Sequence, residues 1–134
     1  MTDLWGEIAA APVRTPLAIL REQAALLGKK TQNLIEAKVA TAVRGPKFVH
    51  RFQLVVPSMT DYTYELFEVS HGIEMYPVTV PVTVPSNPSA EELMAGMLSD
   101  TVANEEEFVA WLRQELSSEK TMRIVSNLLA QVNS

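Results

Sequence analysis

The chain has 134 residues and a formal net charge of −5; 47% of its residues are hydrophobic, 20% are charged, and none is cysteine. This composition is typical of a globular domain, and it excludes wholesale disorder, a disulfide framework and a thiol nucleophile. The length suits a single domain over residues 1–134. Because nucleic-acid binders usually contact phosphates through a surplus of Lys and Arg, the acidic balance predicts no nucleic-acid partner.

The beginning of the chain has no basic region followed by an apolar segment, as a secretory signal would have. No stretch reaches ~18 uninterrupted apolar residues, so the sequence predicts neither a membrane span nor a membrane partner. With no cysteine to pair, a reducing compartment is the natural expectation. We therefore expect a soluble, cytoplasmic protein.

A short helix is expected over residues 3–10. Leu4, Trp5 and Ile8 would share one face of it, and Asp3 or Thr2 would cap it. Pro12 would close the segment, because proline cannot continue a helix.

A longer helix is expected to begin after Thr15, with Pro16 in its first turn, and to end near Gly28. Its apolar arc is wider than the ~100° stripe that one packing face requires. The surplus residues on the flank are Ile19 and Leu26. The arc therefore predicts a contact with a second protein chain through Ile19 and Leu26, although cover by another part of the same chain is the alternative.

From Asn33 onward the hydrophobic period changes from 3.6 to 2, which predicts β-strands. Three strands are expected over residues 35–44, 48–56 and 62–70, and a fourth from residue 73 onward. Gly45-Pro46 is expected to turn the chain between the first two. His71-Gly72 has the pattern of a two-residue hairpin turn before the fourth.

The fourth strand contains Pro77, Pro81 and Pro85 at intervals of four, with valines alternating between them. Residues four apart in a strand point their N–H groups to the same side, so the prolines would remove donors from one side only. This pattern predicts an edge strand that pairs on one side. The alternative is a polyproline-type recognition segment.

Helices are expected again after the fourth strand. Three segments begin with residues suited to a helix N-cap: Ser89 with Glu92, Asn104 with Glu107, and Ser117 or Ser118. Taken together, the elements predict an α+β fold with a four-stranded antiparallel meander sheet packed on N- and C-terminal helices. The opposite face of the sheet would be partly exposed to water.

Signatures of catalysis and of cofactor binding are missing from the sequence. The five glycines are scattered singly, so no phosphate-binding loop can be assembled. The two histidines, His50 and His71, have no second ligand at metal-binding spacing. We expect no cofactor, no metal site and no catalytic residue.

Four residues remain as candidates for ligand binding. His50 shares the parity of the apolar residues of the second strand, and Gln23 lies within the apolar arc of the long helix. Tyr64 and Glu65 lie on the third strand, where they could approach His50 and allow acid–base chemistry. The simpler interpretations are a core histidine bonded to a backbone carbonyl and a buried amide bonded to the backbone.

The wide apolar arc and the lack of catalytic apparatus favour a non-catalytic, adaptor-like domain that binds another protein chain or self-associates into a homo-oligomer. The alternative is a small-ligand-binding protein, or an unassigned enzyme, with a pocket between the sheet and the helices near His50 and Gln23. Native molecular mass and a co-purifying small molecule would distinguish these two functions.

Overall fold

The computed structural model describes residues 2–81 and 99–134. The elements are, in chain order, α1 (Pro16–Lys30), β1 (Glu36–Arg44), β2 (Lys47–Val56), η1 (Pro57–Met59), β3 (Tyr62–His71), β4 (Val78–Pro81), β5 (Ser99–Val102), α3 (Glu105–Leu116) and α4 (Glu119–Val132). The strands form one antiparallel sheet in the order β1-β2-β3-β4-β5. The α+β class and the meander order are confirmed, with five strands rather than four.

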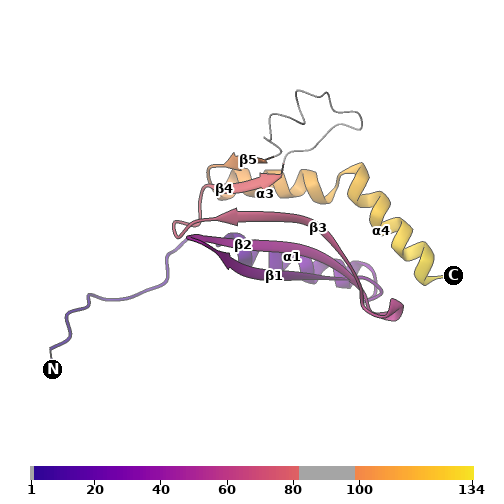
Figure 1. Ribbon diagram of the computed structural model, residues 1–134, viewed down its shortest axis with the longest axis horizontal. Coiled ribbons are helices and arrows are strands. Elements are labelled where there is room, and N and C mark those ends of the chain that lie inside the picture. The colour runs from indigo at the N-terminus through magenta and orange to yellow at the C-terminus, as the bar shows by residue number, and fades with distance from the viewer. Residues whose placement is uncertain (1, 82–98) are drawn as a thin grey trace.

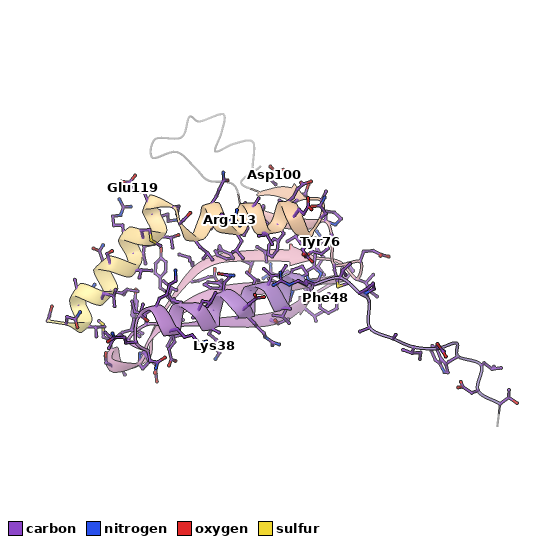
Figure 2. The ribbon with its side chains drawn as sticks, turned by 180° about the vertical axis from the view of Figure 1, so that it is seen from behind. Lys38, Phe48, Tyr76, Asp100, Arg113 and Glu119 are labelled. Atoms are coloured by element: carbon purple, nitrogen blue, oxygen red, sulfur yellow. The ribbon has the colours of Figure 1, made fainter. Side chains whose placement is uncertain are left out.

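Helices α1 and α3 lie on one face of the sheet, and α4 turns away from the line of α3 (Figures 1 and 2). The core lies between these helices and the sheet. Phe52 stacks on Phe67 with ring centroids 5.2 Å apart, and Trp111 meets Phe67 edge-on at 5.1 Å. This aromatic layer joins β2 and β3 to α3, and Ile19 and Leu20 of α1 belong to the same core.

The N-caps of the two C-terminal helices are where the sequence predicts them. Asn104 Oδ1 accepts the N–H of Glu107 at 2.9 Å, and Glu107 Oε1 accepts the N–H of Ala103 at 3.2 Å. Ser118 Oγ accepts the N–H of Thr121 at 3.2 Å. These contacts satisfy backbone donors that the first turn of a helix leaves free.

Helix α1 also has its predicted cap, since Thr15 Oγ1 accepts the N–H of Ala18 at 3.0 Å. The predicted end of the helix near Gly28 is wrong, because the helix continues to Lys30. Gly28 is instead buried within the helix, with Asn33 Oδ1 close to where a Cβ would lie. A larger side chain at position 28 would therefore contact the side chain of Asn33, just after α1 ends.

A bulge in β3 decides which of its side chains face the helices. Phe52 pairs with Phe67 but the next residue, Gln53, pairs with Glu65, so Leu66 is an extra residue in β3. Both Leu66 and Phe67 are buried. The bulge thus lets two consecutive side chains reach the core, whereas a regular strand would alternate them.

The predicted N-terminal helix is not formed. Residues 2–13 contain no helix or strand and extend away from the body of the fold (Figure 1). An isolated helix of eight residues gains too few hydrogen bonds to offset its nucleation cost. Such a segment becomes helical only when its apolar face is covered.

The predicted hairpin turn at His71-Gly72 is also wrong. Strand β3 includes His71, whose side chain is buried, and β4 starts only at Val78. Residues 72–77 connect the two strands, and Ile73, the expected start of the fourth strand, is exposed.

The edge-strand prediction for β4 is wrong within the described residues. Strand β4 pairs with β3 on one side and with β5 on the other. It contains one proline, Pro81, at its last position, opposite Ser99. Pro77 precedes the strand, so its missing N–H removes no bond from the ladder, and two-sided pairing survives. The alternation of valines does place Val78 and Val80 on the covered face, since both are buried. The rest of the proline-rich segment and the helix expected over residues 89–98 lie outside the described residues.

Candidate functional site

A pocket of about 170 Å³ opens between the C-terminal half of α1, the sheet and α4. Its walls are mainly apolar: Leu26, Leu27, Leu54, Leu66, Met122 and Val125. Gln23 and Lys30 of α1 are its polar members, together with Thr121. We call this cavity the α1–α4 pocket.

Two apolar side chains of the α1–α4 pocket reach its opening from opposite walls. Leu26 on α1 is 40% exposed, and Met122 on α4 is 48% exposed. Full burial of such a side chain contributes about 1.5–3 kcal/mol, so covering the exposed part would contribute roughly 1 kcal/mol for each. The pocket therefore offers an occupant apolar surface at its mouth as well as inside.

Gln23 is the predicted ligand-binding residue that the structure places in the pocket. It is half-buried on the α1 wall, and its side-chain amide makes no hydrogen bond to another described residue. In contrast, the hydroxyl of Thr121 is already used, since Oγ1 donates to the carbonyl oxygen of Glu115 at 2.7 Å. The Gln23 amide can therefore both donate to and accept from an occupant.

Of the two residues predicted to contact a partner, Ile19 is not accessible. It is 2% exposed and packs in the core between α1 and the sheet. The prediction that Ile19 contacts a second chain is therefore wrong, and the alternative, cover by the same chain, holds for this residue. Leu26 keeps the predicted exposure. The apolar arc of α1 is wide because it faces both the sheet and the α1–α4 pocket.

A second polar cluster joins His50 to His71. The two Nε2 atoms lie 2.8 Å apart, and both side chains are buried. Thr41 Oγ1 lies 3.0 Å from Nδ1 of His50, and Nδ1 of His71 lies 2.7 Å from the carbonyl oxygen of Gly72. His50 was predicted to face the core, and it does; its partners are a hydroxyl and an imidazole rather than a backbone carbonyl.

The partners fix the tautomers of the neutral pair. The carbonyl of Gly72 only accepts, so Nδ1 of His71 carries the proton and its Nε2 accepts. His50 must then donate from Nε2 and accept from Thr41 at Nδ1. Burial first, then His71 and Arg21, lowers the pKa of His50 from 6.5 to about 4. At neutral pH His50 is therefore uncharged and lies within an internal chain of hydrogen bonds.

The other two ligand candidates do not join His50. Tyr64 pairs with Leu54 and packs against the core, whereas Glu65 pairs with Gln53 on the opposite face. Glu65 lies 3.5 Å from the guanidinium of Arg51 in an ion pair. The expected grouping of Tyr64 and Glu65 with His50 is therefore absent.

The sequence pattern missed the pairing of His71 with His50. His71 has the parity of Phe67 and Val69, which face the core, and this alternation would have placed it in the strand. The Gly that follows it suggested a turn instead.

In the part of the chain that the structure describes, no three His, Asp or Glu side chains are grouped to hold a metal ion. No helix there is both long and apolar enough to span a bilayer. No family model, curated protein or solved structure matches this chain.

Proposed function

We propose that the protein is a non-catalytic, adaptor-like domain that binds an apolar segment of a polypeptide chain in the α1–α4 pocket. The observation that carries this proposal is the exposure of Leu26 and Met122 on opposite walls of one apolar cavity. Methionine adapts its shape to different partners, and buried aromatic or aliphatic anchors in such pockets supply most of the affinity at protein interfaces.

The chemistry of the pocket supports binding rather than catalysis. Gln23 and Thr121 do not titrate near neutral pH, and Lys30 is exposed at the end of α1. The His50–His71 pair does not line the pocket, and its four ring nitrogens are all engaged with protein groups. A general base needs a free nitrogen within reach of substrate.

A small apolar ligand is the second candidate occupant, favoured by the volume of about 170 Å³ and by the Gln23 amide. A cavity of about 150 Å³ lined by aliphatic and aromatic residues accommodates benzene. The exposed side chains at the mouth favour a polypeptide, because a ligand enclosed in the pocket would leave them in water.

Site-specific photo-crosslinking tests the proposal in the protein's own host. A p-benzoylphenylalanine residue replaces Leu26, with Ile73, which is exposed in the β3–β4 connection, as the matched control position. We expect polypeptide adducts at position 26 that are absent at position 73 and are lost in the Met122→Glu variant. Adducts that form equally at both positions, or that survive Met122→Glu, would refute binding in the pocket. A yield of small-molecule adducts alone at position 26 would assign the pocket to a ligand instead.

A further inference from the structure

The N-terminal segment, residues 2–13, presents large apolar side chains to water, and three of them lie within residues 4–8. Leu4 is 90% exposed, Trp5 77% and Ile8 80%. Three such neighbours in one short segment form an apolar surface that gains free energy when it is covered. The same chain therefore contains both an uncovered apolar segment and an open apolar pocket.

The segment already contains one contact of a helix N-terminus. Asp3 Oδ1 accepts the N–H of Trp5 at 2.9 Å, which is the contact that an N-cap residue makes with the second residue of a helix. In a helix that starts there, Leu4, Trp5 and Ile8 fall on one face. Its length prevents it from being stable alone, but contact with a surface would offset the cost of ordering it.

The α1–α4 pocket complements this helix in size and in polarity. Its volume of about 170 Å³ accommodates one aromatic side chain such as that of Trp5. A buried indole N–H needs an acceptor, and the Gln23 amide oxygen can supply it. Lys30 at the pocket is a cation, while Asp3 and Glu7 give the segment two negative charges.

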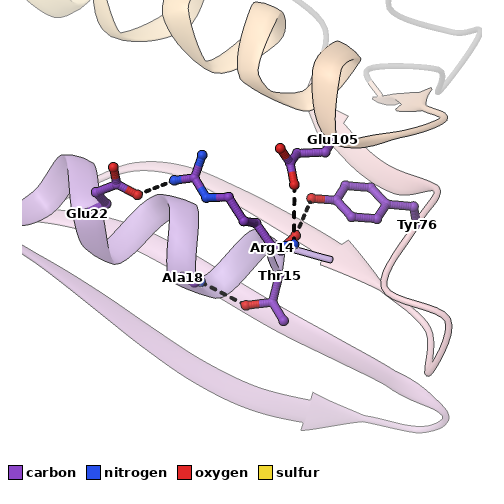
Figure 3. A network of polar contacts seen from close by, with 6 residues as sticks. All are labelled: Arg14, Thr15, Ala18, Glu22, Tyr76 and Glu105. Atoms are coloured by element: carbon purple, nitrogen blue, oxygen red, sulfur yellow. Dashed lines mark hydrogen bonds and ion pairs between the residues drawn. The ribbon is translucent and has the colours of Figure 1, made fainter. Parts of the chain in front are cut away.

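The start of α1 sets the direction in which the segment leaves the fold (Figure 3). The N–H of Arg14 donates to Glu105 Oε1 at 3.2 Å, and the hydroxyl of Tyr76 donates to the carbonyl oxygen of Arg14 at 2.9 Å. Burial, and then the carboxylate of Glu105, raises the pKa of Tyr76, so its hydroxyl stays protonated. The guanidinium of Arg14 also pairs with Glu22. Both backbone groups of Arg14 are thus held by residues distant in sequence.

The two hydrogen bonds to the backbone of Arg14 direct the segment away from the α1–α4 pocket of the same chain. Residues 2–13 leave the fold at the end opposite α4 (Figures 1 and 2). The part of α1 that lines the pocket begins at Gln23, about 10 Å along the helix from Pro16 at a rise of 1.5 Å per residue. The few residues before Arg14 would have to reverse direction, and Pro12 favours an extended conformation for Ala11.

We infer that residues 3–10 of one copy bind as a short helix in the α1–α4 pocket of a second copy, with Trp5 as the anchor. This inference rests on the proposed function and names its occupant. If each copy gives its segment to the other, the two contacts are equivalent and the assembly closes as a two-fold dimer.

Sedimentation of the 134-residue chain tests the exchange. We expect a dimer for the native protein and monomers for the Trp5→Ser and Met122→Glu variants, each weakening association by more than about tenfold, as loss of an interface anchor does. Ile73→Gln, a substitution at an exposed apolar residue outside the pocket, should leave the dimer intact. A dimer that persists in both Trp5→Ser and Met122→Glu would refute the inference.

Mixing provides the decisive measurement. Trp5→Ser retains an intact pocket and Met122→Glu retains an intact segment, so an equimolar mixture contains one of the two native contacts and should associate more strongly than either variant alone. Failure of the mixture to associate would refute the pairing of segment and pocket.

A fluorescence difference between the native protein and Trp5→Phe reports the surroundings of Trp5. A native monomer with a shielded Trp5 would mean that the segment folds back on its own chain and would refute exchange. A native monomer with a solvent-exposed Trp5 would also refute the inference. Specific polypeptide adducts at Leu26, lost in Met122→Glu, would still support the proposed function in either case.

Discussion

Acidification should destabilise the fold through His50. Its pKa is about 4 in the folded protein and 6.5 as a free side chain. Between these pH values the unfolded chain binds more protons than the folded one, so the free energy of unfolding decreases as the pH falls. The part of the free energy of unfolding that depends on a neutral His50 is fully present above pH 6.5 and is lost as the pH falls toward 4.

The size of the effect follows from the same two pKa values. Each pKa unit corresponds to about 1.4 kcal/mol, so lowering the pKa from 6.5 to about 4 corresponds to about 3 kcal/mol of unfolding free energy. The buried position of His50 keeps water from screening this effect. For a domain of this size, that is a large fraction of a total stability of about 5–15 kcal/mol.

Urea unfolding of the native protein and of His50→Gln, at several pH values between 7.5 and 4, measures this contribution. Glutamine does not titrate, and its amide can still donate to Nε2 of His71. The difference between the two proteins isolates His50 from the carboxylates, which titrate in both. We expect the native protein to lose about 3 kcal/mol more than the variant on acidification. Parallel pH profiles for the two proteins would refute the lowered pKa of His50.

Substitutions at four further residues test the packing and the hydrogen bonds. Ile19→Ala should cost about 2–5 kcal/mol of unfolding free energy and Leu26→Ala less than about 1 kcal/mol, because only Ile19 lies in the core; equal losses in thermal or urea unfolding would contradict this assignment. Thr31→Val should cost about 1–3 kcal/mol of unfolding free energy, because valine leaves a buried donor unpaired. The donor is the N–H of Ile35, which Thr31 Oγ1 accepts at 3.2 Å. Thr31→Ser, which keeps the hydroxyl, is the control. Asn104→Ala should cost about 1 kcal/mol and Asn104→Asp much less, since only alanine removes the cap of α3; urea midpoints that do not separate the two would exclude a capping role.

Local patterns in the sequence were sufficient for the elements whose partners are near in the chain. The period of 2 gave β1 and β2 with the Gly45-Pro46 turn, and the caps at Thr15, Asn104 and Ser118 gave the starts of three helices. Each of these features depends on backbone geometry within a few residues.

Features that depend on distant residues were not predictable in the same way. Strand β4 is paired on both sides because β5 lies beside it, and the segment that forms β5 has no strong alternating pattern. The extra residue in β3, Leu66, changes which side chains face the helices beyond it. The bulge puts Glu65 on the face of the sheet opposite to that of Phe67. A strictly alternating pattern does not show where such an extra residue lies.

The long apolar arc of α1 illustrates how a correct pattern led to a partly wrong residue assignment. A helix with a broad apolar face must cover it somewhere, but the sequence does not say which part of the helix length meets its own sheet. Packing against the strands buries Ile19, and the divergence of α4 leaves Leu26 at the mouth of a pocket. Ile19 and Leu26 are seven residues apart and lie on nearly the same side of α1, about 10 Å apart along its axis. The exposed apolar surface therefore lies toward the C-terminal end of this face, where Met122 of α4 also lines the pocket. A partner that uses this surface must contact both α1 and α4, so substitutions on either helix should weaken binding of the same occupant.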